Sequence, residues 1–212
     1  MTDISEPDSL AAQVLFGDRL PLAERYVGHL ATTGIERGLL GPREVPRLWN
    51  RHVLNCAVTA ELFPANATVA DVGSGAGLPG IAVAIARPDL SFTLIEPLER
   101  RVIWLREVVE DLELGNVEVF RGRAEEAVGK VSATVVTARA VSALGGLAAM
   151  TIPILQGTGQ LLAIKGRSAG EEVTKARKLI RKLGGRETTV LQVGEGLLEQ
   201  PTTVVRIIVG GS

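Results

Sequence analysis

The chain has 212 residues, 46% of them hydrophobic, with a formal net charge of −1. These values exclude a disordered or strongly basic chain and predict one globular domain, or a domain with an extension, with a large core. The single cysteine, Cys56, excludes an intrachain disulfide, and no cysteine–histidine cluster has metal-ligand spacing. Segment 1–8 lacks a signal-peptide pattern and no apolar run could span a bilayer, so we expect a soluble cytoplasmic protein with neither metal nor membrane partner.

The first part of the chain is predicted to be helical. It shows no strand alternation, and its apolar residues recur at helical spacing over 10–16, over 22–30 and from Trp49 to Leu62. Glycines and prolines separate these segments. We therefore expect residues 1–66 to form an N-terminal helical extension, followed by a second region over 67–212.

A glycine-rich segment opens the second region. Residues 69–80 read VADVGSGAGLPG, an apolar strand that stops at a carboxylate and gives way to four glycines before a helix. Glycine allows positive φ and close approach of a ligand to the backbone, and the helix start adds free N–H groups. The G-x-G-x-x-G spacing alone would also fit a dinucleotide. Asp71 favours S-adenosylmethionine, because a carboxylate can accept a hydrogen bond from the ammonium group of this cofactor. We expect Gly73 and Gly75 to be further cofactor contacts.

Strands and helices alternate after this segment, which is typical of a parallel sheet with crossover helices. The last two predicted strands have no helix between them and indicate an antiparallel hairpin. This is the α/β, Rossmann-like architecture of class I S-adenosylmethionine-dependent methyltransferases, with a seven-stranded, mostly parallel sheet. We expect strands at 68–72, 91–95, 117–120, 133–138, 158–164, 187–193 and 202–209, and helices at 79–87, 98–113, 143–154 and 170–183.

Polar residues at the predicted strand ends are the next candidates, because ligands bind beyond the carboxyl ends of such strands. Glu96 ends the second strand and could accept from both ribose hydroxyls, or only favour a helix start. Segment 121–125 follows the third strand, where adenine should lie, although Glu125 could equally cap a helix. Arg139 and Lys165 end the fourth and fifth strands. We interpret them as a pair of substrate-binding cations; each alone could be solvated.

Basic residues are concentrated near the predicted helix at 170–183. This segment favours a nucleic-acid partner, because charge distribution matters more than net charge. Lys175, Lys178 and Lys182 fall on one helix face. The alternative is the solvated face of an amphipathic helix. Segment 165–186 contains two acidic residues, Glu171 and Glu172, and eight basic residues: Lys165, Arg167, Lys175, Arg177, Lys178, Arg181, Lys182 and Arg186.

Five motifs together resemble the bacterial ribosomal RNA small subunit methyltransferase G family, also called glucose-inhibited division protein B. They are DVGSGAGLPG at 71–80, LWNRH at 48–52, GRAE at 122–125, TARA at 137–140 and Lys165-Gly166. The resemblance implies methyl transfer from S-adenosylmethionine to N7 of a guanine in the 530 loop of 16S rRNA, position 527 in the usual rRNA numbering. The small ribosomal subunit would be the partner. By motif match, the residues carried over as cofactor contacts are Gly73, Leu78, Ala124, Glu125 and Arg139.

The implied reaction fits the side chains. Guanine N7 has a free lone pair and no proton, so no general base is expected, and Arg139 and Lys165 would act by positioning the substrate. We expect the RNA to be contacted by Arg51, His52, Arg123, Lys165, Arg167, Lys175, Lys178 and Lys182.

Several residues keep a second interpretation. His52 could equally be a packing histidine, and His29 and Cys56 are expected to be structural. Trp49 and Trp104 could stack on bases, with core packing favoured for Trp104. A small-molecule methyltransferase and a non-catalytic nucleotide-binding module remain alternatives at this point. We expect the protein to act as a monomer.

Overall fold

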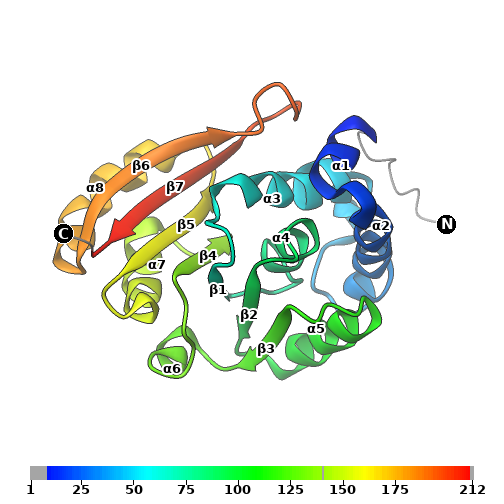
Figure 1. Ribbon diagram of the computed structural model, residues 1–212, viewed down its shortest axis with the longest axis horizontal. Coiled ribbons are helices and arrows are strands. Elements are labelled where there is room, and N and C mark those ends of the chain that lie inside the picture. Colours follow the sequence, from blue (N-terminus) through cyan, green and yellow to red (C-terminus); the bar gives the residue numbers. More distant parts are fainter. Residues whose placement is uncertain (1–8, 140, 211–212) are drawn as a thin grey trace.

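The computed structural model describes residues 9–139 and 141–210, so segment 1–8 and Ala140 of the TARA motif lie outside the described residues. A seven-stranded sheet in the order β3-β2-β1-β4-β5-β7-β6 forms the centre of the molecule (Figure 1). The neighbouring strands β1 to β5 pair in parallel, whereas β7 is antiparallel to both β5 and β6. The predicted fold class, a mostly parallel sheet with a terminal antiparallel hairpin, is confirmed.

All the predicted strands are present, with ends equal to the expected ones or shifted by about one or two residues. The central strands β1 and β4 are almost entirely buried, because helices cover both faces of the sheet. The edge strand β6 carries exposed polar side chains instead. The strands are β1 (Thr68–Val72), β2 (Ser91–Glu96), β3 (Val117–Arg121), β4 (Val135–Arg139), β5 (Gly159–Lys165), β6 (Gly185–Val193) and β7 (Thr202–Val209).

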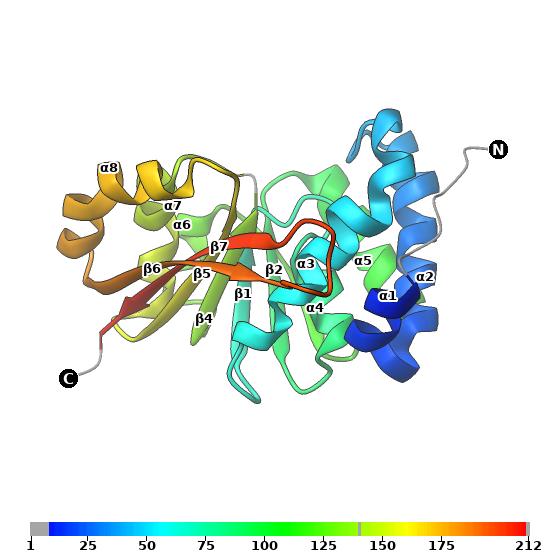
Figure 2. The same ribbon diagram turned by 90° about the horizontal axis from the view of Figure 1, so that it is seen from above.

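Helices of the second region lie on both faces of the sheet. Figure 2 shows α6, α7 and α8 on one side, with α4 and α5 on the other. The short helix α6 was not predicted, because four residues are too few to show a helical period. The bounds are α4 (Gly80–Ala86), α5 (Glu99–Asp111), α6 (Ala124–Ala127), α7 (Leu144–Thr151) with its continuation η6 (Ile152–Leu155), and α8 (Ala169–Lys182).

The extension is helical as expected, but much of it deviates from α geometry. The predicted helix from 49 to 62 is one continuous path through η4, α3 and η5, and both η2 and η4 are π-helical. The bounds are α1 (Ser9–Phe16), η1 (Gly17–Arg19), α2 (Leu20–His29), η2 (Leu30–Gly34), η3 (Pro42–Arg47), η4 (Leu48–Leu54), α3 (Asn55–Ala57) and η5 (Val58–Leu62). None of the helices described is long and apolar enough to cross a membrane.

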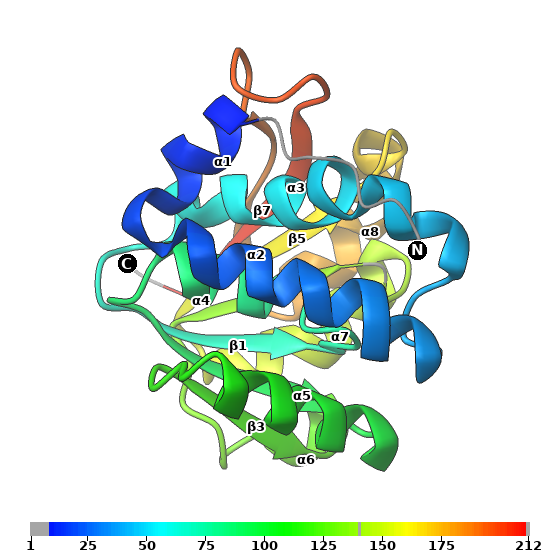
Figure 3. The same cartoon turned by 90° about the vertical axis from the view of Figure 1, so that its right-hand side faces the viewer.

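The extension packs directly on the sheet region. Figure 3 shows α1, α2 and α3 layered beside α4 and β1. Tyr26 and Trp49 of the extension belong to the same buried cluster as Ile81, Phe92 and Trp104 of the second region. A second cluster lies on the other face of the sheet, under α6, α7 and α8. Residues 9–62 and one face of the sheet therefore share one hydrophobic core.

Candidate active site

Asp71, Glu96 and Arg139 stand at the carboxyl ends of the neighbouring strands β1, β2 and β4. Val69 and Leu94, each two residues earlier in its strand, belong to the core beneath α4. Because side chains alternate along a strand, Asp71 and Glu96 point toward that same face. The sheet thus gathers charged side chains at one edge, on the side covered by the extension.

Asp71 is completely buried and only half satisfied. Its Oδ2 accepts a hydrogen bond from the backbone N–H of Gly80 at 3.1 Å. Its Oδ1 is buried and has no hydrogen-bond partner among the described residues. Burial raises the pKa of the Asp71 carboxyl to about 7, against the lowering effect of the Ser74 hydroxyl, the Gly80 N–H and Arg139. A buried acceptor without a donor is uncommon in native proteins, and this one is placed to receive an N–H from a ligand.

The backbone conformation of the glycine loop requires glycine at three positions. Gly73, Gly75 and Gly77 have φ values of +71°, +57° and +82°, which residues with a Cβ rarely adopt. The loop is also held from outside, since the buried hydroxyl of Tyr26 on α2 donates to the carbonyl of Ala76 at 2.7 Å. The extension therefore fixes the conformation of the predicted cofactor loop.

Glu96 links this loop to the start of the next helix. Its Oε2 accepts from the N–H of Gly75 and its Oε1 from the N–H of Leu98, both at 3.0 Å. The side chain is buried, and the guanidinium of Arg101 lies 3.7 Å away. Each carboxylate oxygen keeps a second lone pair for a further donor. The ribose-binding role of Glu96 stays a prediction that this geometry permits.

Arg139 is oriented by a chain of hydrogen bonds that reaches into the extension. Its Nη2 donates to Nδ1 of His52 at 2.9 Å, and Nε2 of His52 lies 2.6 Å from Oε2 of Glu44. Arginine has no acceptor, so Nδ1 must accept and Nε2 must carry the proton, which makes this imidazole neutral. Burial lowers the pKa of His52, while the hydrogen bond to Glu44 opposes that shift. The packing interpretation of His52 fits these contacts, and its direct contact with RNA stays a prediction.

Lys165 lies away from Arg139, which corrects the expectation of a cation pair. In the β4–β5 register Arg139 pairs with Ile164, so Lys165 is one residue further and points to the opposite face. There its Nζ donates to the carbonyl of Ser142 at 2.6 Å and to Oε2 of Glu172 at 2.8 Å. With its side chain only 10% exposed, Lys165 fastens the segment before α7 to α8. Its substrate contact stays untested.

The remaining predicted cofactor contacts lie around the same edge. The side chain of Leu78 is buried in the core, and Ala124 is buried where α6 begins. Glu125 is exposed and does not cap the helix. Glu126 caps the start of α6 instead, because its Oε2 accepts from the backbone N–H of Arg123 at 3.3 Å. Contacts of these residues with a cofactor stay predictions.

Apart from Lys165, the cations predicted to bind RNA are exposed, but they are widely spread. We call the carboxyl ends of the parallel strands the active edge. The lysines of α8 lie progressively further from this active edge, because α8 begins there at Ala169 and rises about 1.5 Å per residue. Lys182 is therefore on the order of 20 Å along the helix from its start. The exposed cations are Arg51, Arg123, Arg167, Lys175, Lys178 and Lys182.

The aromatic and sulfur side chains are structural. Trp49 is buried and packs edge-to-face on Phe16 with ring centroids 6.5 Å apart, so of its two interpretations the structure supports core packing and not stacking on a base. Trp104 is buried as predicted and donates to Oγ1 of Thr33 at 2.8 Å. Cys56 is confirmed as a buried thiol, and burial raises its pKa to about 11. The described part of the chain holds no cluster of three metal-ligating side chains.

Three residues of the site escaped sequence reasoning: Tyr26, Glu44 and Glu172. Tyr26 has the helical spacing of a core residue, and nothing in the sequence marks its hydroxyl. Glu172 was counted only as a negative charge within a basic segment. A hint existed for Glu44 alone, since it lies eight residues before His52, about two helical turns away.

Comparison with known proteins agrees with this geometry. Residues 19–202 match the family model described as rRNA small subunit methyltransferase G. A protein of that name from Pseudarthrobacter chlorophenolicus is 70% identical over 99% of this chain and 97% of its own length. Another from Streptomyces avermitilis is 54% identical over the whole of this chain and 90% of its own.

Solved structures share the fold at low sequence identity. An O-methyltransferase family protein from Burkholderia thailandensis superposes with a TM-score of 0.61 at 16% identity, covering 95% of this chain and 71% of that one. A putative S-adenosylmethionine-dependent methyltransferase from Methanococcus maripaludis gives 0.59 at 12% identity, covering 90% and 93%. The sheet order, the glycine loop and the matched sequence lead to one conclusion: the chain belongs to the rRNA small subunit methyltransferase G family.

Proposed function

We propose that this chain transfers the methyl group of S-adenosylmethionine to N7 of a guanine in the 530 loop of 16S rRNA. The observation that carries the proposal is the buried, unpartnered Oδ1 of Asp71 beside the glycine loop, in a chain of this family. When bound, the cofactor supplies a methyl group already activated as a sulfonium. Because the substrate is part of the small ribosomal subunit, the proposed place of action is the cytoplasm.

The residues present suit this cofactor. The free oxygen of Asp71 can accept from its ammonium group, and Glu96 lies where a ribose would be bound in a doubly wound fold. A side chain at Gly73 would crowd the loop, since its Cβ would lie 3.0 Å from the side chain of Val141. We propose that backbone near Ala124 contacts the adenine.

The chain needs no general base for this reaction, because N7 carries no proton. Its task is to hold N7 in line with the methyl group, and such positioning contributes on the order of 7–11 kcal/mol. Arg139 suits this task because His52 fixes its guanidinium in one orientation beside the loop. We propose that Arg139 aligns the substrate or the cofactor, with Lys165 acting at most through the segment that it fastens.

We further propose a division of labour along the chain. Residues 67–212 would form the methyltransferase domain, and residues 1–66 an extension that buttresses the loop through Tyr26 and the arginine through His52. Arg51, Arg123 and Arg167 would contact RNA around the active edge, and the α8 lysines would contact a more distant part of the RNA. A monomer would suffice for this arrangement.

Two measurements test the proposal. Calorimetric titration should show binding of S-adenosylmethionine and none of NAD. Incubation with methyl-labelled cofactor and small subunits that lack the modification should then place label in the RNA fraction. Binding of NAD in preference to S-adenosylmethionine, or label in a small molecule instead of the RNA, would contradict it.

A further inference from the structure

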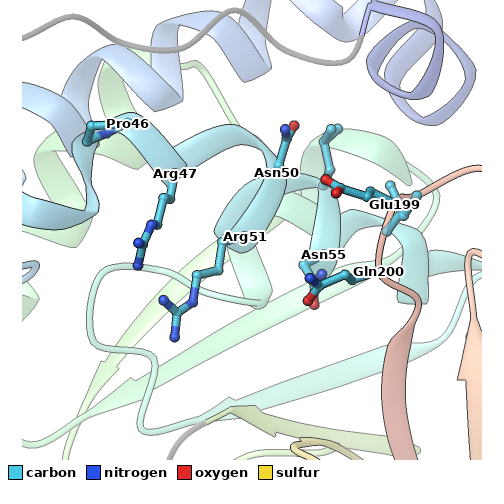
Figure 4. A pocket seen from close by; sticks show the side chains of 9 residues that line it. Pro46, Arg47, Asn50, Arg51, Asn55, Glu199 and Gln200 are labelled. Atoms are coloured by element: carbon cyan, nitrogen blue, oxygen red, sulfur yellow. The ribbon is translucent and has the colours of Figure 1, made fainter.

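A cavity of about 510 Å³ lies between the η3–η4 segment and the loop that joins β6 to β7 (Figure 4). The cofactor contacts do not account for it, although Asn50 and Arg51 of the LWNRH motif belong to its lining. Its lining is polar: side chains of Arg47, Asn50, Arg51 and Asn55 come from the extension, and those of Glu199 and Gln200 from the hairpin loop. A volume of this size is typical of pockets for small organic ligands.

The cavity adjoins the active edge of the sheet. In the β5–β7 ladder Lys165 pairs with Thr203, so antiparallel β7 begins at the edge where the parallel strands end. The hydroxyl of Thr202 donates to the carbonyl of Asn55 at 2.8 Å, which ties the hairpin to the extension there. On the other side, Arg51 immediately precedes His52, which holds Arg139.

The two ends of the cavity differ in charge. Arg47 and Arg51 project from the same side of the helical segment (Figure 4), and the Arg51 side chain is 61% exposed, with Glu44 no closer than 3.9 Å. Such guanidinium groups bind phosphates bidentately. Glu199 contributes a carboxylate from the hairpin, next to the amide of Gln200. The lining thus combines phosphate-binding groups with groups that can read a base.

A carboxylate distinguishes guanine from adenine. Guanine presents two donors on its Watson–Crick edge, N1–H and the N2 amino group, and one carboxylate can accept from both. Adenine has an acceptor at N1, which would face the carboxylate with like polarity. An amide such as that of Gln200 or Asn55 can donate to guanine O6.

We propose that this cavity receives the target guanosine nucleotide, turned out of the RNA, with Glu199 accepting from N1–H and N2–H and with Arg47 and Arg51 on the flanking phosphates. The inference rests on the proposed function. Nucleic-acid methyltransferases commonly extrude the target base and read its Watson–Crick edge. Since N7 belongs to the Hoogsteen edge and not to the Watson–Crick edge, recognition by Glu199 leaves N7 free to react.

The decisive variant is Glu199→Gln, with Glu195→Gln as its control, because Glu195 is an exposed carboxylate in the same loop outside the cavity. On unmodified small subunits we expect kcat/KM to fall on the order of tenfold or more in Glu199→Gln, the usual loss for a hydrogen bond to a charged group. Glu195→Gln should behave as wild type. Both variants should bind S-adenosylmethionine with unchanged affinity.

Nucleotide competition tests the base that is read. With the wild-type enzyme, 5′-GMP should inhibit methyl transfer at lower concentration than 5′-IMP, which lacks the 2-amino group, or 5′-AMP. Glu199→Gln should abolish that order. An unchanged kcat/KM in Glu199→Gln, an equal loss in Glu195→Gln, or no preference for GMP in the wild type would overturn the inference. If the wild type itself methylates no subunit RNA, the proposed function fails instead.

Discussion

Replacing Asp71 with asparagine should make the folded chain more stable at neutral pH while weakening cofactor binding. Burial raises the pKa of this carboxyl from 3.8 to about 7 in the folded chain. At about 1.4 kcal/mol per unit of pKa, ionising the buried group costs the fold on the order of 4 kcal/mol. Asparagine carries no charge and can still accept from the N–H of Gly80, so part of this cost disappears.

The effect of Asp71 on folding stability depends on pH, and its direction follows from the raised pKa. Between about pH 4 and 7 the folded chain keeps the Asp71 proton while the unfolded chain has lost it, so this group lowers stability as pH rises through that window. Denaturant unfolding of both proteins at several pH values isolates the effect as a difference. The stability of Asp71→Asn relative to wild type should grow from about pH 4 to 7 and then level off.

Cofactor binding should show the opposite trend. The ionised carboxylate accepts from the cofactor's ammonium group, so wild-type affinity for S-adenosylmethionine should rise as pH increases to about 7 and fall above about 8, where an α-amino group loses its proton. Asp71→Asn should bind at least about tenfold more weakly, without the rise below pH 7. A variant that is no more stable at pH 7.5, and that binds with the wild-type pH profile, would refute the reasoning.

Three further outcomes are expected. Gly73→Val should fold, yet calorimetry should detect no binding of S-adenosylmethionine, because φ is +71° at this position and the side chain would enter the cofactor space; wild-type affinity would exclude the loop from the site. Replacing Lys175, Lys178 and Lys182 by glutamine should flatten the salt dependence of subunit binding by about one logarithmic unit of slope per lost phosphate contact, whereas an unchanged slope would make α8 a solvated face. The single-turnover rate of the bound complex should be nearly independent of pH from about pH 6 to 9, because no proton leaves N7; a tenfold rise across that range, absent in His52→Gln, would indicate a catalytic base.

The sheet and the loop could be predicted because their signals are local. Alternation of strand and helix, the glycines and Asp71 all lie within short segments, and each segment formed as expected. The failure at Lys165 has a local cause too. A difference of one residue in strand register reverses the face of a side chain, so adjacent strand ends do not imply adjacent cations.

Contacts between distant segments could not be predicted in the same way. The contacts of His52 with Arg139 and of Tyr26 with Ala76 depend on how the extension packs over the sheet. The periodicity of apolar residues in one sequence does not reveal that packing. The π-helical geometry of η4 adds to this, because it changes which residues share a face. The sequence therefore does not identify the partner of a polar residue that lies within an apolar helical pattern.

The central claim is most directly tested by locating the methyl group in the RNA. Small subunits lacking the modification are treated with the enzyme and methyl-labelled cofactor, and the purified 16S rRNA is cleaved chemically at 7-methylguanine and mapped by primer extension. We expect a single cleavage site at one guanine of the 530 loop, absent without enzyme. Label at another atom, which resists that cleavage, or at a nucleotide outside the loop would contradict it.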